Sequence, residues 1–131
     1  MSAVLRARVA SALVPDPIVA LLARGSGGVM RDFIALTKDA LTTARSAERA
    51  EVEPGDVHSA FEALAERRLL FLSDDRLDVV RRIFEGADVT GTTRALEDLL
   101  ASCDVLPRDL PNRYAIHPVV REVLERRRKV A

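Results

Sequence analysis

The segment 26–32, with the sequence Ser-Gly-Gly-Val-Met-Arg-Asp, holds the residues whose types and spacing best suit an interaction with phosphate. Gly27 and Gly28 let the backbone turn sharply and come close to a ligand, and the helix that follows presents free N–H groups and a positive dipole end. Arg31 adds a planar guanidinium that can bind two phosphate oxygens at once. Because a cation in the first turn of a helix is unfavourable by about 0.3–1 kcal/mol, its position there favours a functional role.

The neighbouring residue Asp32 leaves a simpler interpretation open. Its carboxylate partly offsets the charge of Arg31. In that interpretation Arg31 is a surface residue paired with an acid, and the two glycines form an ordinary turn.

The lysines exclude a complete nucleotide-binding site within this chain. A phosphate-binding P-loop needs Gly-Lys followed by Ser or Thr. The only two lysines are Lys38 and Lys129, and neither follows a glycine. The segment 69–75, Leu-Leu-Phe-Leu-Ser-Asp-Asp, is superficially similar to a strand that delivers a magnesium-binding acid. We interpret it instead as the buried end of one helix followed by the cap of the next.

Cysteine and histidine do not suggest an active site or a metal centre. The chain has one cysteine, Cys103, and two histidines, His58 and His117. Cys103 and His117 could face each other across a hairpin, but a single small thiol in an apolar stretch is typical of a core residue. His117 is expected to end a strand and to lead into a helix that begins at Pro118. An enzyme in its own right is therefore the least favoured function, and no metal ligand is predicted.

Composition excludes further classes. The chain has 131 residues, with 20 Lys+Arg and 20 Asp+Glu, so its formal net charge is zero. A general nucleic-acid binder is disfavoured, because sequence-independent affinity comes from many Lys and Arg contacts to phosphate. No apolar stretch approaches the roughly 18 residues of a membrane span, and arginines interrupt the N-terminal segment where a signal peptide would be apolar. A cytoplasmic protein with no membrane partner is expected.

Residues 1–66 are expected to form a four-helix bundle. The hydrophobic period predicts helices over residues 4–13, 16–25 with Asp16 as its cap, 26–50, and from Pro54 to near Glu66. The long third helix is expected to bury one stripe of residues, namely Met30, Phe33, Ile34, Thr37, Leu41 and Ala44.

Residues 67–131 predict a second domain with a different order of elements. The expected elements are a helix containing Leu77 to Phe84 and ended by Gly86, a helix capped by Thr90 or Thr92, strands over 103–106 and 113–117, and a helix from Pro118. Two helices, a hairpin and a closing helix follow one another in a winged helix. The predicted fold class is therefore mainly α, with a bundle over 1–66 and a winged helix with a small β-hairpin over 67–131.

The motif at 26–32 follows a short helix and opens a long one, after which comes a helix that begins with proline. This arrangement resembles the helical lid of AAA+ ATPases. Arg31 matches the sensor-2 arginine of that family. The second half resembles the winged helix that follows the lid in several prokaryotic members, and residues 114–121 resemble their Tyr-x-x-His-Pro-x-Val-Arg stretch.

The resemblance implies a role in coupling rather than in bond breaking. Arg31, with Gly27 and Gly28, would sense the γ-phosphate of ATP bound with magnesium in a separate P-loop core. The winged helix would transmit the motion of the lid to a protein partner or to a neighbouring subunit of an oligomer. Because the core is absent, the chain is expected to be the C-terminal part of such an ATPase, cut out or encoded separately, and to neither hydrolyse ATP nor bind it tightly alone.

Two other functions stay open at the level of sequence. One is a winged-helix regulator that binds DNA. Its recognition helix, residues 93–102, would carry one arginine against two acids, which is a poor face for a polyanion. The other is a protein-interaction module without a nucleotide role. The candidate contacts for DNA or a protein partner are Arg94, Arg108, Arg113, Arg126, Arg127 and Arg128.

Overall fold

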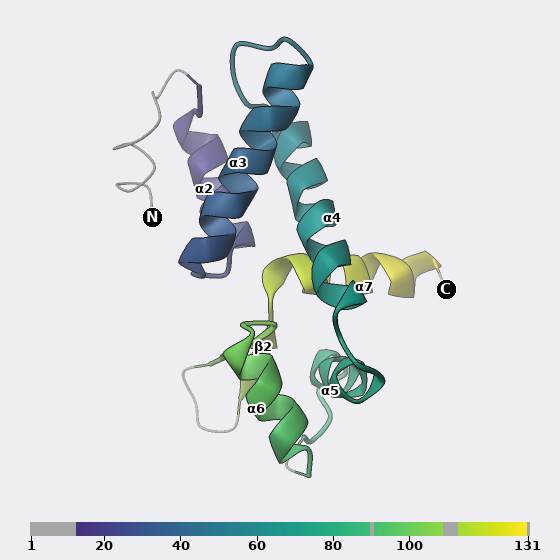
Figure 1. Ribbon diagram of the computed structural model, residues 1–131. Helices are drawn as coiled ribbons and strands as arrows, with labels where there is room; N and C mark the ends of the chain where they lie inside the picture. The colour runs from purple at the N-terminus through teal and green to yellow at the C-terminus, as the bar shows by residue number, and fades with distance from the viewer. Residues whose placement is uncertain (1–12, 90, 109–112, 131) are drawn as a thin grey trace. The chain divides into compact units, whose positions relative to one another are not determined.

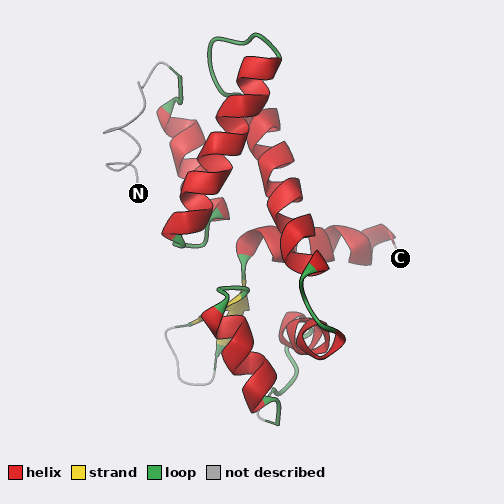
Figure 2. Cartoon of the chain, viewed as in Figure 1, coloured by secondary structure: helices red, strands yellow, loops and turns green. Residues whose placement is uncertain are grey.

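The computed structural model describes residues 13–89, 91–108 and 113–130. These residues form six helices and one two-stranded antiparallel sheet (Figures 1 and 2). The prediction of a mainly helical protein with a small hairpin is confirmed. The predicted helix over 4–13 lies outside the described residues. The chain divides into two compact units, one up to Leu64 and one from Ala65.

The first unit contains α2 (Asp16–Gly25), α3 (Met30–Ser46) and most of α4 (Pro54–Leu70). Its core is built from apolar residues of all three helices. These include Ile18, Val19, Leu22, Phe33, Leu36, Ala40, Ala44, Val57, Ala60, Phe61 and Leu64. The prediction that Asp16 caps α2 is wrong, because Pro15 occupies the cap and Asp16 is already helical. Pro17 fits in the first turn, where a missing N–H costs no helical hydrogen bond.

The buried face of α3 differs from the predicted stripe. Met30 and Ile34 were expected in the core, but their exposed fractions are 41% and 47%. Leu36 and Ala40 are fully buried in their place. The helix also begins at Met30 and ends at Ser46, so it is shorter than the predicted span of 26–50.

Gly25, the last residue of α2, allows that helix to approach α4 closely. A Cβ atom at Gly25 would lie 2.2 Å from Cζ and 2.3 Å from Cε1 of the buried Phe61 ring. We expect Gly25→Ala to lower the free energy of unfolding by about 1–3 kcal/mol, the usual cost of overpacking a core. Urea unfolding followed by far-UV circular dichroism measures the effect.

The matched control is Gly55→Ala in the first turn of α4, where an added Cβ atom meets no atom within 4 Å. This variant is expected to be unchanged or more stable by up to about 1 kcal/mol, because alanine reduces the entropy of the unfolded chain. Equal unfolding midpoints for the two variants would contradict the close packing at Gly25.

The second unit contains the last turn of α4, then α5 (Asp74–Phe84), α6 (Thr93–Ala101), β1 (Val105–Pro107), β2 (Tyr114–Ile116) and α7 (Pro118–Val130). The order is the predicted one. Val105 pairs with Ile116, Leu106 with Ala115 and Pro107 with Tyr114. Both strands are shorter than predicted. Cys103 lies before β1 at a positive φ of 62°, which interrupts an extended backbone.

The end of α4 is longer and more exposed than predicted. The helix continues beyond Glu66 to Leu70, and Arg67 and Arg68 lie in its last turn, where the dipole favours cations. Leu70 and Phe71 are each 79% exposed, so the prediction of a buried helix end is wrong. The second half of that prediction holds, since the Ser73 side chain caps α5 by accepting a hydrogen bond from the N–H of Arg76 at 3.4 Å.

Candidate functional site

The turn between α2 and α3 places the candidate phosphate-binding residues. Ser26 is fully buried, and its hydroxyl donates to the carbonyl of Ala23 at 2.7 Å. The N–H of Val29 donates to the carbonyl of Ser26 at 3.0 Å, which closes the turn. Gly27 and Gly28 have φ values of 61° and 83°, in the region that favours glycine. A Cβ atom at Gly28 would meet nothing within 4 Å, so that glycine serves the backbone conformation rather than close packing.

Arg31 lies in the first turn of α3 and is exposed. Val29 occupies the cap of this helix and provides no side-chain acceptor to the first turn. Within the described residues, Arg31 forms no hydrogen bond or ion pair. Only 3% of Asp32 is exposed, so its carboxylate does not lie at the surface beside the guanidinium of Arg31. The simpler interpretation, in which Arg31 is paired with a nearby acid, is therefore not supported by the described residues.

Arg31 belongs to a wider exposed face of α3. Met30 and Ile34 recur at a four-residue interval on this face, and Lys38 and Arg45 continue it toward the end of the helix. The helix has two acidic residues: Asp32 is buried and Asp39 is half-buried on another side. The face thus combines exposed apolar groups with cations and has no carboxylate, which suits an anionic or acidic partner surface.

The other candidate contacts come from three parts of the second unit: α6, the hairpin and α7. Arg108 and Arg113 continue the hairpin register by one position beyond Pro107 and Tyr114, with the N–H of Arg108 donating to the carbonyl of Arg113 at 2.9 Å. Arg94 is exposed on α6. On α7, Arg126 pairs with Glu122 at 3.6 Å, the Arg128 guanidinium carbon lies 5.9 Å from the centre of the Phe84 ring, and Arg127 is exposed.

The acidic residues of α6 remain beside Arg94, as the sequence indicates. Glu97 is exposed, and Asp98 forms an ion pair with Arg76 of α5 at 3.1 Å. This face of α6 therefore carries little net positive charge. Its charge does not favour contact with a polyanion.

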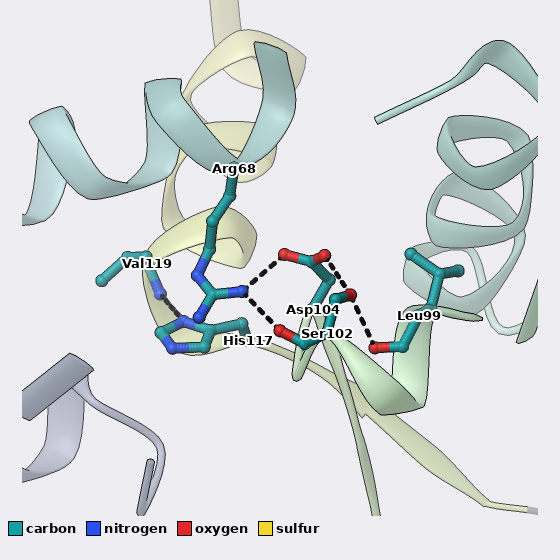
Figure 3. Close-up of polar contacts among 6 residues, drawn as sticks. All are labelled: Arg68, Leu99, Ser102, Asp104, His117 and Val119. Atoms are coloured by element: carbon teal, nitrogen blue, oxygen red, sulfur yellow. Dashed lines mark hydrogen bonds and ion pairs between the residues drawn. The ribbon is translucent and has the colours of Figure 1, made fainter. Parts of the chain in front are cut away.

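Sequence reasoning missed a polar cluster in the second unit, formed by Arg68, Ser102, Asp104 and His117 (Figure 3). Asp104 and His117 are buried, whereas Ser102 lies at the exposed edge of the cluster. The guanidinium of Arg68 donates to Asp104 Oδ1 at 2.7 Å and to the carbonyl of Ser102 at 3.1 Å. The Ser102 hydroxyl donates to Asp104 Oδ2 at 2.5 Å. Only 9% of the Arg68 and Asp104 side chains is exposed, so this ion pair is largely shielded from water.

His117 joins this cluster to the start of α7. Its N–H donates to the carbonyl of Asp104 at 2.9 Å, which extends the hairpin pairing by one position beyond Ile116. The carbonyl of His117 accepts from the N–H of Arg121 at 3.0 Å, and its ring Nδ1 accepts from the N–H of Val119 at 3.4 Å. The prediction that His117 ends a strand and leads into the Pro118 helix is confirmed.

Comparison with known proteins adds no assignment: no family model matches the chain, and neither the curated proteins nor the solved structures contain a significant match. Among the described residues, no three Cys, His, Asp or Glu side chains are grouped so that they could hold a metal ion. No helix in the described ranges has both the length and the apolar character required to cross a membrane.

Proposed function

We propose that this chain is the lid and winged-helix region of an AAA+ ATPase, in which Arg31 senses the γ-phosphate of ATP held by a separate P-loop core. The observation that carries the proposal is the position of Arg31. It is exposed in the first turn of α3, directly after two glycines with positive φ, and has no partner among the described residues. An anion at this position would relieve the unfavourable contact between the guanidinium and the positive helix end.

The chemistry that this chain would supply is charge stabilisation. Magnesium and the attacking water would be held by the core, which provides the P-loop that this sequence lacks. Arg31 would bind the equatorial oxygens of the transferred phosphoryl group, where negative charge is held in the transition state. The apolar residues Met30 and Ile34 beside it would pack against the core and fix the position of the guanidinium.

The second unit supports the same proposal through its order of elements. Helices α5 and α6, the β1–β2 hairpin and α7 follow one another as in a winged helix. In the proposed ATPase this unit transmits the nucleotide-dependent motion of the lid to a protein partner or to a neighbouring subunit. Helix α4 begins in the first unit and ends in the second, so one continuous helix connects the two.

The proposal is tested by finding the core. We expect a Gly-x-x-x-x-Gly-Lys-Ser/Thr motif and an apolar run ending in Asp-Glu, either upstream in the same reading frame or in a separate protein that binds this chain. If the core is a separate protein, its affinity for this chain, measured by calorimetry, should be higher when the core holds a non-hydrolysable ATP analogue than when it holds ADP. The Lys38→Ala variant, altered on the same face of α3, should keep this nucleotide dependence, whereas Arg31→Ala should lose it. Identical affinity of the unmodified chain in both nucleotide states would contradict a sensing role.

A further inference from the structure

The end of α4 holds two large apolar side chains at the surface. Leu70 and Phe71 are each 79% exposed. The ion pair between Arg68 and Asp104 fixes the same turn of the helix, so both side chains are presented by an ordered backbone. Exposed apolar groups with charged residues around them mark surfaces that contact another molecule. Leu70 and Phe71 therefore indicate an interaction surface.

The charge beside this apolar pair is negative. Asp74 and Asp75 lie in the first turn of α5, and both are exposed without an ion pair to any residue that the structure describes. Glu66 and Arg67, one turn before the apolar pair, are exposed and offset each other in charge. The helix dipole favours acids at the start of α5 but gives no reason to expose Phe71. We call four residues the α4–α5 surface, namely Leu70, Phe71, Asp74 and Asp75.

The end of α7 carries the opposite charge and a further exposed apolar side chain. Residues 125–130 are all exposed, and Val130 is 91% exposed. Arg127 and Lys129 form no ion pair within the described ranges. We call Arg127, Lys129 and Val130 the α7 end surface. It is basic and apolar, and so complements the acidic and apolar α4–α5 surface.

The two surfaces of one copy lie beside opposite ends of α5. The guanidinium carbon of Arg128 lies 5.9 Å from the centre of the Phe84 ring, which places the end of α7 beside the last turn of α5. Asp74 and Phe84, the first and last residues of α5, are about 15 Å apart along the helix axis. The charges of each surface are thus available to a second molecule.

We propose that the α7 end surface of one copy of this chain binds the α4–α5 surface of a second copy. The contact combines ion pairs between Arg127 or Lys129 and the two aspartates with burial of the exposed apolar side chains. Contact between two α4–α5 surfaces would bring four carboxylates together, and contact between two α7 ends would gather cations, so like charge disfavours both. Because each copy has both surfaces, the contact can repeat from copy to copy. The inference does not depend on the nucleotide role of Arg31.

Sedimentation velocity of the full 131-residue chain, without nucleotide, measures this association. The contact contains few apolar side chains and belongs with small, weak interfaces, so larger species should appear between about 10 µM and about 1 mM protein. Raising the salt concentration from about 0.05 M to about 0.5 M should increase the dissociation constant about tenfold, because exposed charges are then screened. A chain that stays monomeric up to about 1 mM at low salt would overturn the proposal.

Two variants separate the two surfaces. Leu70→Ser with Phe71→Ser removes the apolar part of the α4–α5 surface, and Arg127→Glu with Lys129→Glu reverses the charge of the α7 end surface. Each variant alone should stay monomeric where the unmodified chain associates. Mixed together, they should form a one-to-one complex and nothing larger, because each supplies the surface that the other lacks. Association of either variant alone, or no complex in the mixture, contradicts the proposed contact.

The matched control is Arg24→Glu with Arg94→Glu. These arginines are exposed on α2 and α6, and their replacement changes the net charge by the same amount as the α7 variant. The control should associate as the unmodified chain does. If it becomes monomeric, net charge rather than the α7 end surface governs the association, and the proposal fails.

Cross-linking identifies the contact on the unmodified chain. The only lysines are Lys38 and Lys129. A carbodiimide activates a carboxylate, which then forms an amide with a lysine amine in direct contact while the reagent leaves as a urea. In a mixture of isotope-labelled and unlabelled chains, Lys129 of one copy should be joined to Asp74 or Asp75 of the other. Cross-links from Lys129 to these aspartates within single copies only, or no such cross-link at all, would overturn the proposal.

Discussion

Arg31→Ala is expected to lower kcat for ATP hydrolysis about 100-fold in the ATPase of which we propose this chain is a part. The expected size is that of removing one preorganised donor from developing negative charge, which costs about 10²–10³ in rate. Since Arg31 is exposed and has no described partner, the variant should not destabilise the chain. Its unfolding midpoint should be unchanged or slightly higher, because a cation leaves the positive end of α3. Steady-state turnover and thermal unfolding measure the two quantities.

Lys38→Ala is the matched control for this prediction. Lys38 is exposed on the same face of α3, about two turns farther along, so its removal changes the charge of the face by the same amount. Turnover of this variant should stay within about twofold of the unmodified enzyme, because a surface charge at that distance is screened. Unchanged turnover in Arg31→Ala, or equal losses in both variants, would remove Arg31 from the mechanism.

The features that could be predicted from sequence are those with local causes. Proline fixes φ and lacks an N–H, so Pro118 indicates the first turn of α7 without any knowledge of the fold. Ser73 caps the start of α5, and Gly86, with a φ of 76°, lies in the turn just after the end of this helix. Both effects involve only residues a few positions away in the sequence. Gly27 and Gly28 indicate the turn before α3 by the same kind of signal, although the helix begins at Met30 rather than at residue 26.

The features that could not be predicted depend on distant residues. In α3, apolar residues occupy more than one face, and only the positions of α2 and α4 decide that Leu36 is buried while Met30 and Ile34 are exposed. That choice changes the candidate site, because the two exposed side chains lie beside Arg31. Arg68 and Asp104 are 36 positions apart, and nothing in the sequence around either residue indicates that they pair.

The pairing of Arg68 with Asp104 leads to the second large expected effect. Arg68→Ala should lower the free energy of unfolding of the second unit by about 3–5 kcal/mol, because it leaves the Asp104 carboxylate buried without its cation. The matched control is Arg76→Ala, which removes an ion pair with Asp98 whose side chains are 40% and 44% exposed. Exposed pairs contribute about 0–1 kcal/mol, so the control should be nearly as stable as the unmodified chain.

Tyr114 makes the measurement specific to the second unit. The chain has one tyrosine and no tryptophan, and Tyr114 lies in β2, so its fluorescence during urea unfolding reports on that unit.

The double variant Arg68→Met with Asp104→Leu replaces both partners of the ion pair. It should lose less free energy of unfolding than Arg68→Ala alone, because no unpaired charge is then buried. If instead the two arginine variants lose similar stability, the Arg68–Asp104 pair is accessible to water in solution and cannot hold the last turn of α4 to the hairpin. Stability losses that differ by several kcal/mol between them would establish the buried pair as the contact that joins the end of α4 to the start of β1.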